Sequence, residues 1–127
     1  TGVQTCALPI SAQDHDLAIR LAEAAPVGYM DEILWCYRRH GGSISSTKAK
    51  LRWQNGFKIL EAASRRYPYP ASVCRKRRAV LHFRLGQCLM QEKSFHKAAY
   101  HMMLAGLFDP MRTIRVLSGS EQVSSPN

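Results

Sequence analysis

Two stretches of the chain carry side chains that could do chemistry. The first places two carboxylates, Asp14 and Asp16, at the expected beginning of a short helix. The second places an imidazole, His40, in a glycine-containing loop directly after a run of aromatic and branched residues. Reactive groups commonly lie on loops and element ends that a rigid scaffold positions. There, a carboxylate could act as a general base and a neutral imidazole could ligate a metal.

Residue chemistry alone leaves plainer roles open for the same side chains. Asp14 and Asp16 could cap the helix and interact favourably with its dipole, which is the commoner use of acidic residues in a first turn. His40 could be an ordinary surface histidine of its loop. Neither stretch chooses between these roles when it is considered by itself.

The elements that must position these residues are expected to be mainly helical. Apolar periodicity and Pro26 predict a short helix over 14–25. Aromatic and branched residues predict a strand over 33–38, followed by a loop. Further helices are expected over 48–66, 71–91, 94–107 and 110–117, before a disordered tail over 118–127.

The two stretches together resemble the C-terminal part of family-two glycosyltransferases, inverting enzymes with the GT-A fold. Members show a Glu-Asp pair, then Tyr or His, Asp-Leu, and a later Arg and Leu. The matching residues here are Gln13, Asp14, His15, Asp16, Leu17, Arg20 and Leu21. Members then show a strand that ends in Tyr-Arg-x-His, which matches residues 37–40. The two motifs in this order are more specific than either motif alone.

The resemblance implies a role for four residues. Asp14 matches the catalytic base that takes the proton of the acceptor hydroxyl while its oxygen attacks the anomeric carbon. His40 matches a histidine that helps to hold a divalent metal, Mg or Mn, and the nucleotide diphosphate. Arg38 could bind phosphate, because a guanidinium suits that group. Gln13 would lie beside the substrate and stands where members have Glu, which removes a charge next to the base.

The resemblance also implies that the chain is a fragment. Members bind the nucleotide sugar on an N-terminal half of strand-helix-strand units with an Asp-x-Asp motif, each unit needing roughly 30 or more residues. No such unit precedes Asp14. Residues 12–47 would end the α/β catalytic domain and residues 48–117 would form a helical extension. We expect no activity and no bound metal in the fragment alone.

The first residues of the chain have a different expected origin. Residues 1–10, TGVQTCALPI, carry no charge and follow no helical or strand period. They resemble the translation of a common sequencing adapter. Residues 1–11 are therefore expected to be an artefactual leader that takes no part in the fold.

The helical extension contains a pattern that resembles one tetratricopeptide-like helix pair. Over residues 79–112 it has Leu85-Gly86 in the first helix, alanines in the second and a closing Pro110. Gly86, Ala98 and Ala105 are small enough to let the two helices approach closely. Any antiparallel helical hairpin would fit the same pattern, and a single unit cannot bury its faces alone.

Composition limits the partners and the location. The net charge is +9, and the densest basic group comprises Arg75, Lys76, Arg77, Arg78 and Arg84. Such a group could meet anionic lipid, nucleic acid or an acidic polymer, or it could be a solvated helix face. The four cysteines are never at CxxC spacing, which predicts free thiols.

Two functions follow from these observations. The first is a glycosyltransferase that acts in the cytoplasm, or at the inner face of the plasma membrane through a peripheral contact. Its partners would be a nucleotide-sugar donor and a glycan or lipid-linked acceptor, with no nucleic acid. The alternative is a small basic helical module that binds protein, nucleic acid or an anionic surface.

Overall fold

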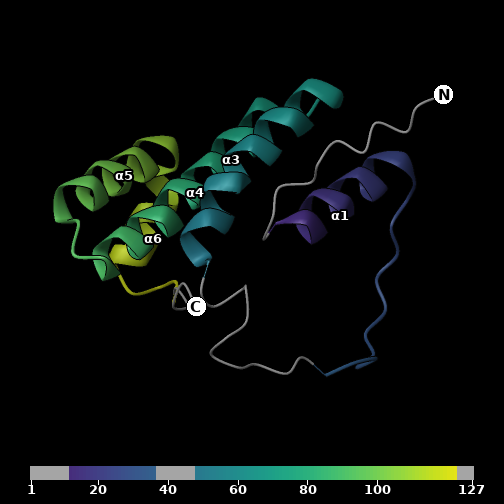
Figure 1. Ribbon diagram of the computed structural model, residues 1–127, viewed down its shortest axis with the longest axis horizontal. Helices are drawn as coiled ribbons and strands as arrows, with labels where there is room; N and C mark the ends of the chain where they lie inside the picture. Colours follow the sequence, from purple (N-terminus) through teal and green to yellow (C-terminus); the bar gives the residue numbers. More distant parts are fainter. Residues whose placement is uncertain (1–11, 37–47, 123–127) are drawn as a thin grey trace.

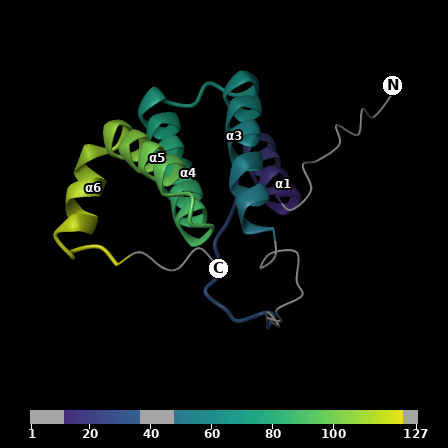
Figure 2. The ribbon, with the colours of Figure 1, turned by 60° about the vertical axis from the view of Figure 1, so that its left-hand side comes forward.

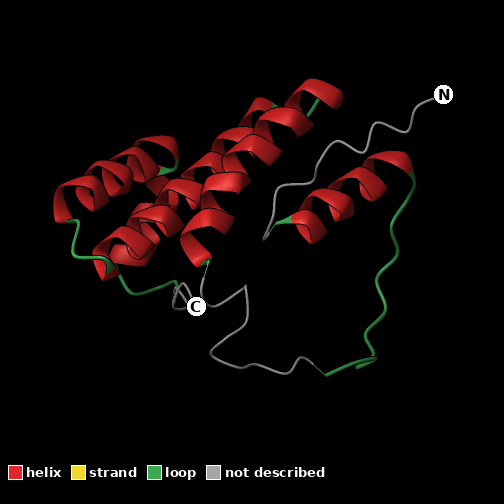
Figure 3. Ribbon diagram, in the orientation of Figure 1, coloured by secondary structure: helices red, strands yellow, loops and turns green. Residues whose placement is uncertain are grey.

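The computed structural model describes residues 12–36 and 48–122, and this part of the chain contains helices and no strand (Figures 1 and 3). The helices are α1 (Gln13–Ala24), α3 (Ala49–Arg66), α4 (Ala71–Gln91), α5 (Phe95–Phe108) and α6 (Pro110–Leu117). The sequence therefore predicted a mainly α chain correctly, and each helix begins and ends within one residue of its expected bounds.

The strand expected over 33–38 is not formed over 33–36, and residues 37 and 38 lie outside the described residues. Residues 33–36 follow an irregular, exposed path, with Ile33 94% exposed. A strand is stable only when a neighbouring strand satisfies its backbone groups, and the described residues offer none. The expected remnant of an α/β domain is therefore not seen in this part of the chain.

Helix α4 lies between α3 and α5 and packs antiparallel to both (Figures 1 and 2). An early residue of α3, Lys50, pairs with Glu92 just after α4. Between α4 and α5, His82 contacts His101. The core is built from Leu85, Leu89 and Ala98, with Trp53 and Phe57 of α3 packed against it. The apolar positions of three successive helices thus share one core.

Small residues set the spacing between the helices, as the sequence predicted for Gly86. A Cβ atom added to Gly86 would lie 3.1 Å from the Cε atom of Met102 on α5. At Gly56 on α3, an added Cβ would lie only 2.5 Å from a methyl group of Leu81, which is completely buried. Both glycines therefore permit a close approach that a larger residue would oppose.

The turns between helices have local physical causes. Pro68 and Pro70 end α3 and begin α4, because proline disfavours helix at the preceding residue. Lys93 adopts a left-handed backbone with φ of 59° at the turn into α5. Asp109 caps α6, its carboxylate accepting a hydrogen bond from the Arg112 backbone N–H at 3.2 Å.

Helix α1 lies beyond α3, on the side away from α5 (Figures 1 and 2). At the other end of the chain, residues 118–122, expected to belong to a disordered tail, form a turn after α6. The Glu121 carboxylate of this turn pairs with Arg112 at 2.7 Å. None of the helices within 12–36 and 48–122 is both long and apolar enough to cross a lipid bilayer.

Candidate functional site

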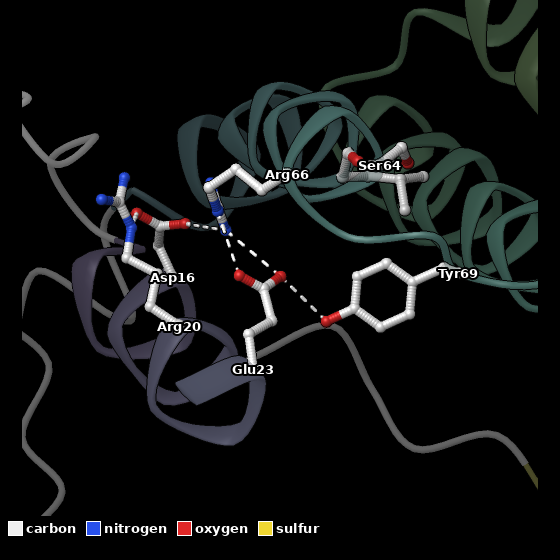
Figure 4. A network of polar contacts seen from close by, with 7 residues as sticks. Asp16, Arg20, Glu23, Ser64, Arg66 and Tyr69 are labelled. Atoms are coloured by element: carbon white, nitrogen blue, oxygen red, sulfur yellow. Dashed lines mark hydrogen bonds and ion pairs between the residues drawn. The ribbon is translucent and has the colours of Figure 1, made fainter. Parts of the chain in front are cut away.

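The inner face of α1 carries one of the two motif aspartates. Asp16 is only 2% exposed. Its Oδ2 accepts a hydrogen bond from the Arg20 Nε one turn later, at 3.0 Å. Its Oδ1 lies 3.8 Å from the Arg66 Nη2 at the end of α3 (Figure 4). Two cations therefore compensate the burial of this carboxylate, as a buried charge requires.

Glu23 lies two turns after Asp16 on α1 and contacts the same arginine, Arg66. Its carboxylate accepts hydrogen bonds from the Arg66 Nε at 3.1 Å and from the Tyr69 hydroxyl at 2.9 Å. Figure 4 shows the Arg66 guanidinium between Asp16 and Glu23. The hydrogen bond from Arg66 is the main cause of a lowered pKa of Glu23, while burial and then Glu23 raise the pKa of Tyr69. Arg66 thus joins α1 to α3.

Asp14 lies on the opposite side of α1 and is exposed. Two residues along a helix correspond to a rotation of about 200°, so Asp14 must point away from α3 when Asp16 points toward it. Leu17 and Leu21 follow Asp14 by three and seven residues, share its face and are exposed too. The Asp14 carboxylate therefore stands in solvent at the end of an uncovered apolar stripe.

Neither motif aspartate caps α1. The N-cap residue is Ala12, which makes no side-chain capping bond. Asp14 and Asp16 lie in the first turn, where their charge interacts favourably with the helix dipole. Gln13 opens the helix and is exposed beside Asp14. The dipole role holds for both aspartates, whereas only Asp16 is buried and paired with arginines.

His15 forms a contact that its sequence motif did not predict. Its Nε2 lies 2.9 Å from the Arg77 Nη2 of α4. A guanidinium can only donate, so the imidazole must accept with a free Nε2 lone pair. Burial and then the Arg77 charge lower the pKa of His15, which favours this neutral form. His15 therefore ties the first turn of α1 to α4.

The other two predicted site residues, Arg38 and His40, lie outside the described residues. Within 12–36 and 48–122, no group of three His, Cys, Asp or Glu side chains could hold a metal ion. The described residues thus do not build a metal site by themselves. Cys36, Cys74 and Cys88 are free thiols.

A paired imidazole contact lies between α4 and α5. The Nδ1 atoms of His82 and His101 are 2.9 Å apart, so one ring must donate and the other accept. The His82 ring also stacks on Phe108 and meets the edge of Phe57. Burial lowers the pKa of both histidines, and the charges of His101 and Arg78 lower that of His82 further.

An apolar cavity of about 350 Å³ lies between α4, α5 and α6. Its walls include Val80, Phe83 and Met102, and none of the motif residues of α1 lines it.

No family model, no curated protein and no solved structure was found to match the chain. At α1, the described residues offer one solvent-facing carboxylate, that of Asp14. Asp16, Glu23 and His15 hold this helix in place through ionic contacts and hydrogen bonds.

Proposed function

We propose that this chain is the acceptor-side, C-terminal part of an inverting family-two glycosyltransferase. The enzyme transfers a sugar from a nucleotide-sugar donor to an acceptor hydroxyl in the synthesis of a cell-surface polysaccharide or glycan. One observation carries the proposal: the motif position of the base, Asp14, is exposed, while Asp16 and Arg20 of the same motif pair with each other. The motif thus divides into a free carboxylate and an anchor for its helix.

The reaction assigns a defined step to Asp14. The acceptor hydroxyl gives its proton to the Asp14 carboxylate as its oxygen forms a bond to the anomeric carbon. The bond from that carbon to the donor phosphate breaks, and the nucleotide diphosphate leaves with the electron pair. Attack opposite the leaving group inverts the configuration. Asp16 takes no proton in this step, because it is buried in its contacts with Arg20 and Arg66.

Uncovered apolar surface supports a larger catalytic domain. Leu17 and Leu21 on the Asp14 face of α1 are exposed, and so are Ile33, Leu34 and Trp35 further along the chain. Exposed apolar patches commonly mark a surface that another body covers. We propose that the donor-binding half covers them, which would place Asp14 at the edge of the contact, beside the donor.

The proposed donor contacts depend on residues beyond those described. Arg38 would bind a donor phosphate and His40 would ligate the divalent metal, together with residues of the donor-binding half. When bound, that metal would neutralise charge on the nucleotide diphosphate. Gln13 would contact the acceptor beside Asp14. The enzyme would act in the cytoplasm on a glycan or lipid-linked acceptor, without nucleic acid.

The genomic sequence upstream of Ala12, obtained from uncontaminated DNA, tests this proposal. We expect several strand-helix units that contain an Asp-x-Asp motif, in frame with Asp14. An authentic start codon immediately before Ala12 would contradict the proposal. That result would favour the alternative, a small basic helical module, for which the net charge of +9 is the supporting observation.

A further inference from the structure

Helix α6 presents apolar side chains to solvent. Thr113 lies 3.8 Å from the position that a Cβ atom would take at Gly106, so this side of α6 faces α5. Around the helix, Met111 lies about 160° and Ile114 about 100° from Thr113. The two side chains are 66% and 61% exposed. Leu117 at the end of the helix is exposed too. No packing among the described residues accounts for this apolar face.

Cations surround the apolar face. In the helical projection of α6, Met111 lies between Ile114 and Arg115, so Arg115 borders the apolar face. Arg75 and Lys76 of α4 line the same groove as Met111 and Arg115. None of these three cations forms an ion pair with a carboxylate of the described residues.

The acidic residues of the groove are already occupied. The Glu121 carboxylate pairs with Arg112 at 2.7 Å. The Asp109 carboxylate caps the backbone of α6. The groove therefore keeps an uncompensated positive charge next to exposed methionine and isoleucine side chains.

We propose that Met111, Ile114, Arg115, Arg75 and Lys76, here called the α6 surface, bind an anionic lipid bilayer. A bilayer matches both halves of this surface, because apolar side chains enter the boundary between headgroups and acyl chains while Lys and Arg remain at the anionic headgroups. A nucleic acid would use the cations but would leave Met111 and Ile114 in water. The proposal concerns α4 and α6 alone and does not depend on the transferase assignment.

Sedimentation of the full chain with lipid vesicles tests the charged half of the surface. We expect binding to vesicles of phosphatidylcholine and phosphatidylglycerol in equal parts, and no binding to phosphatidylcholine alone. The variant Arg75→Gln/Lys76→Gln/Arg115→Gln should partition about a hundredfold more weakly, since each cation near the headgroups contributes about fivefold. The matched variant Lys48→Gln/Lys58→Gln/Lys97→Gln has the same net charge and should lose much less.

The double variant Met111→Ser/Ile114→Ser tests the apolar half of the surface. It should bind the anionic vesicles at least about tenfold more weakly, because two buried side chains contribute to insertion. The control Val27→Ser/Met30→Ser removes similarly exposed apolar side chains elsewhere and should bind as the parent chain does. Circular dichroism should show unchanged helicity in all four variants, since the altered side chains are exposed.

Three outcomes would overturn the proposal. Equal binding to neutral and anionic vesicles would remove the role of the cations. Equal losses in the test and control charge variants would show that net charge, rather than this surface, is responsible. Unchanged vesicle binding by Met111→Ser/Ile114→Ser, with duplex DNA displacing the protein from the vesicles, would indicate a polyanion site instead of a membrane surface.

Discussion

Asp14 and Asp16 are two residues apart on α1, yet one carboxylate is exposed and the other is almost completely buried. The rotation between the two positions on a helix produces this difference. Asp16 faces Arg66 of α3, and Asp14 faces solvent beside Leu17 and Leu21. A general base must be reachable by its substrate, and a positioning residue must be held. The two aspartates meet these separate requirements.

Replacing Asp16 should weaken the attachment of α1. The variant Asp16→Asn removes the buried carboxylate that pairs with Arg20 and with Arg66, although Arg66 keeps Glu23, and should cost about 1–3 kcal/mol of the free energy of unfolding. Urea unfolding followed by circular dichroism measures this change. The control Asp14→Asn alters an exposed side chain and should change stability by about 0.5 kcal/mol or less. Equal losses in the two variants would contradict the assigned division.

Acidification should release α1 from α3. The pKa of Glu23 is lowered from its ordinary value of 4.5, so its ionised form stabilises the folded chain. That stabilisation is present above the ordinary value and is lost as the pH falls through the lowered pKa. Protection of the α1 amides from hydrogen exchange, relative to their intrinsic rates at each pH, should therefore fall as the pH drops through the lowered pKa. In Glu23→Gln this acid-dependent loss of protection should be smaller, and an identical loss would refute the role of Glu23.

The histidine pair predicts a second dependence on pH. The pKa values of His82 and His101 lie below their ordinary value of 6.5, so the unfolded chain binds more protons than the folded one just below that pH. Stability should thus be complete above 6.5 and fall as the pH drops through the lowered values. Thermal unfolding across this range measures the slope. His82→Gln should reduce the slope, and an unchanged slope in this variant would contradict the assigned role of the pair.

Close helix packing predicts an asymmetry between two glycines. Gly56→Ala would place a methyl group 2.5 Å from fully buried Leu81, and the required shift should cost about 1–3 kcal/mol of unfolding free energy. Gly86→Ala meets only the flexible Met102 side chain and should cost less, partly because alanine favours a helix. Differential scanning calorimetry compares the two. A larger loss at Gly86 than at Gly56 would contradict the described packing.

The sequence predicted the helices well because the signals for them are local. These signals are the helical spacing of apolar residues and the prolines Pro68, Pro70 and Pro110. It did not predict the contacts of α1, because Arg66 and Tyr69 lie more than 40 residues beyond Asp16 or Glu23 and follow no motif. It also placed a strand where residues 33–36 are irregular, since aromatic and branched composition indicates a strand without supplying its neighbour. The sequence could not predict which of the two aspartates is exposed, because that depends on how α1 packs against α3.

The most direct test of the central claim is the rate of sugar transfer. It is measured on the longer protein that, as we propose, contains this chain. Asp14→Asn should lower the rate by about 10²–10⁴-fold, the contribution of a general base, while nucleotide-sugar binding stays the same. Asp31→Asn, the same change at an exposed position after α1, serves as the matched control and should transfer at the parent rate. Undiminished transfer by Asp14→Asn would contradict the assignment of Asp14 as the base.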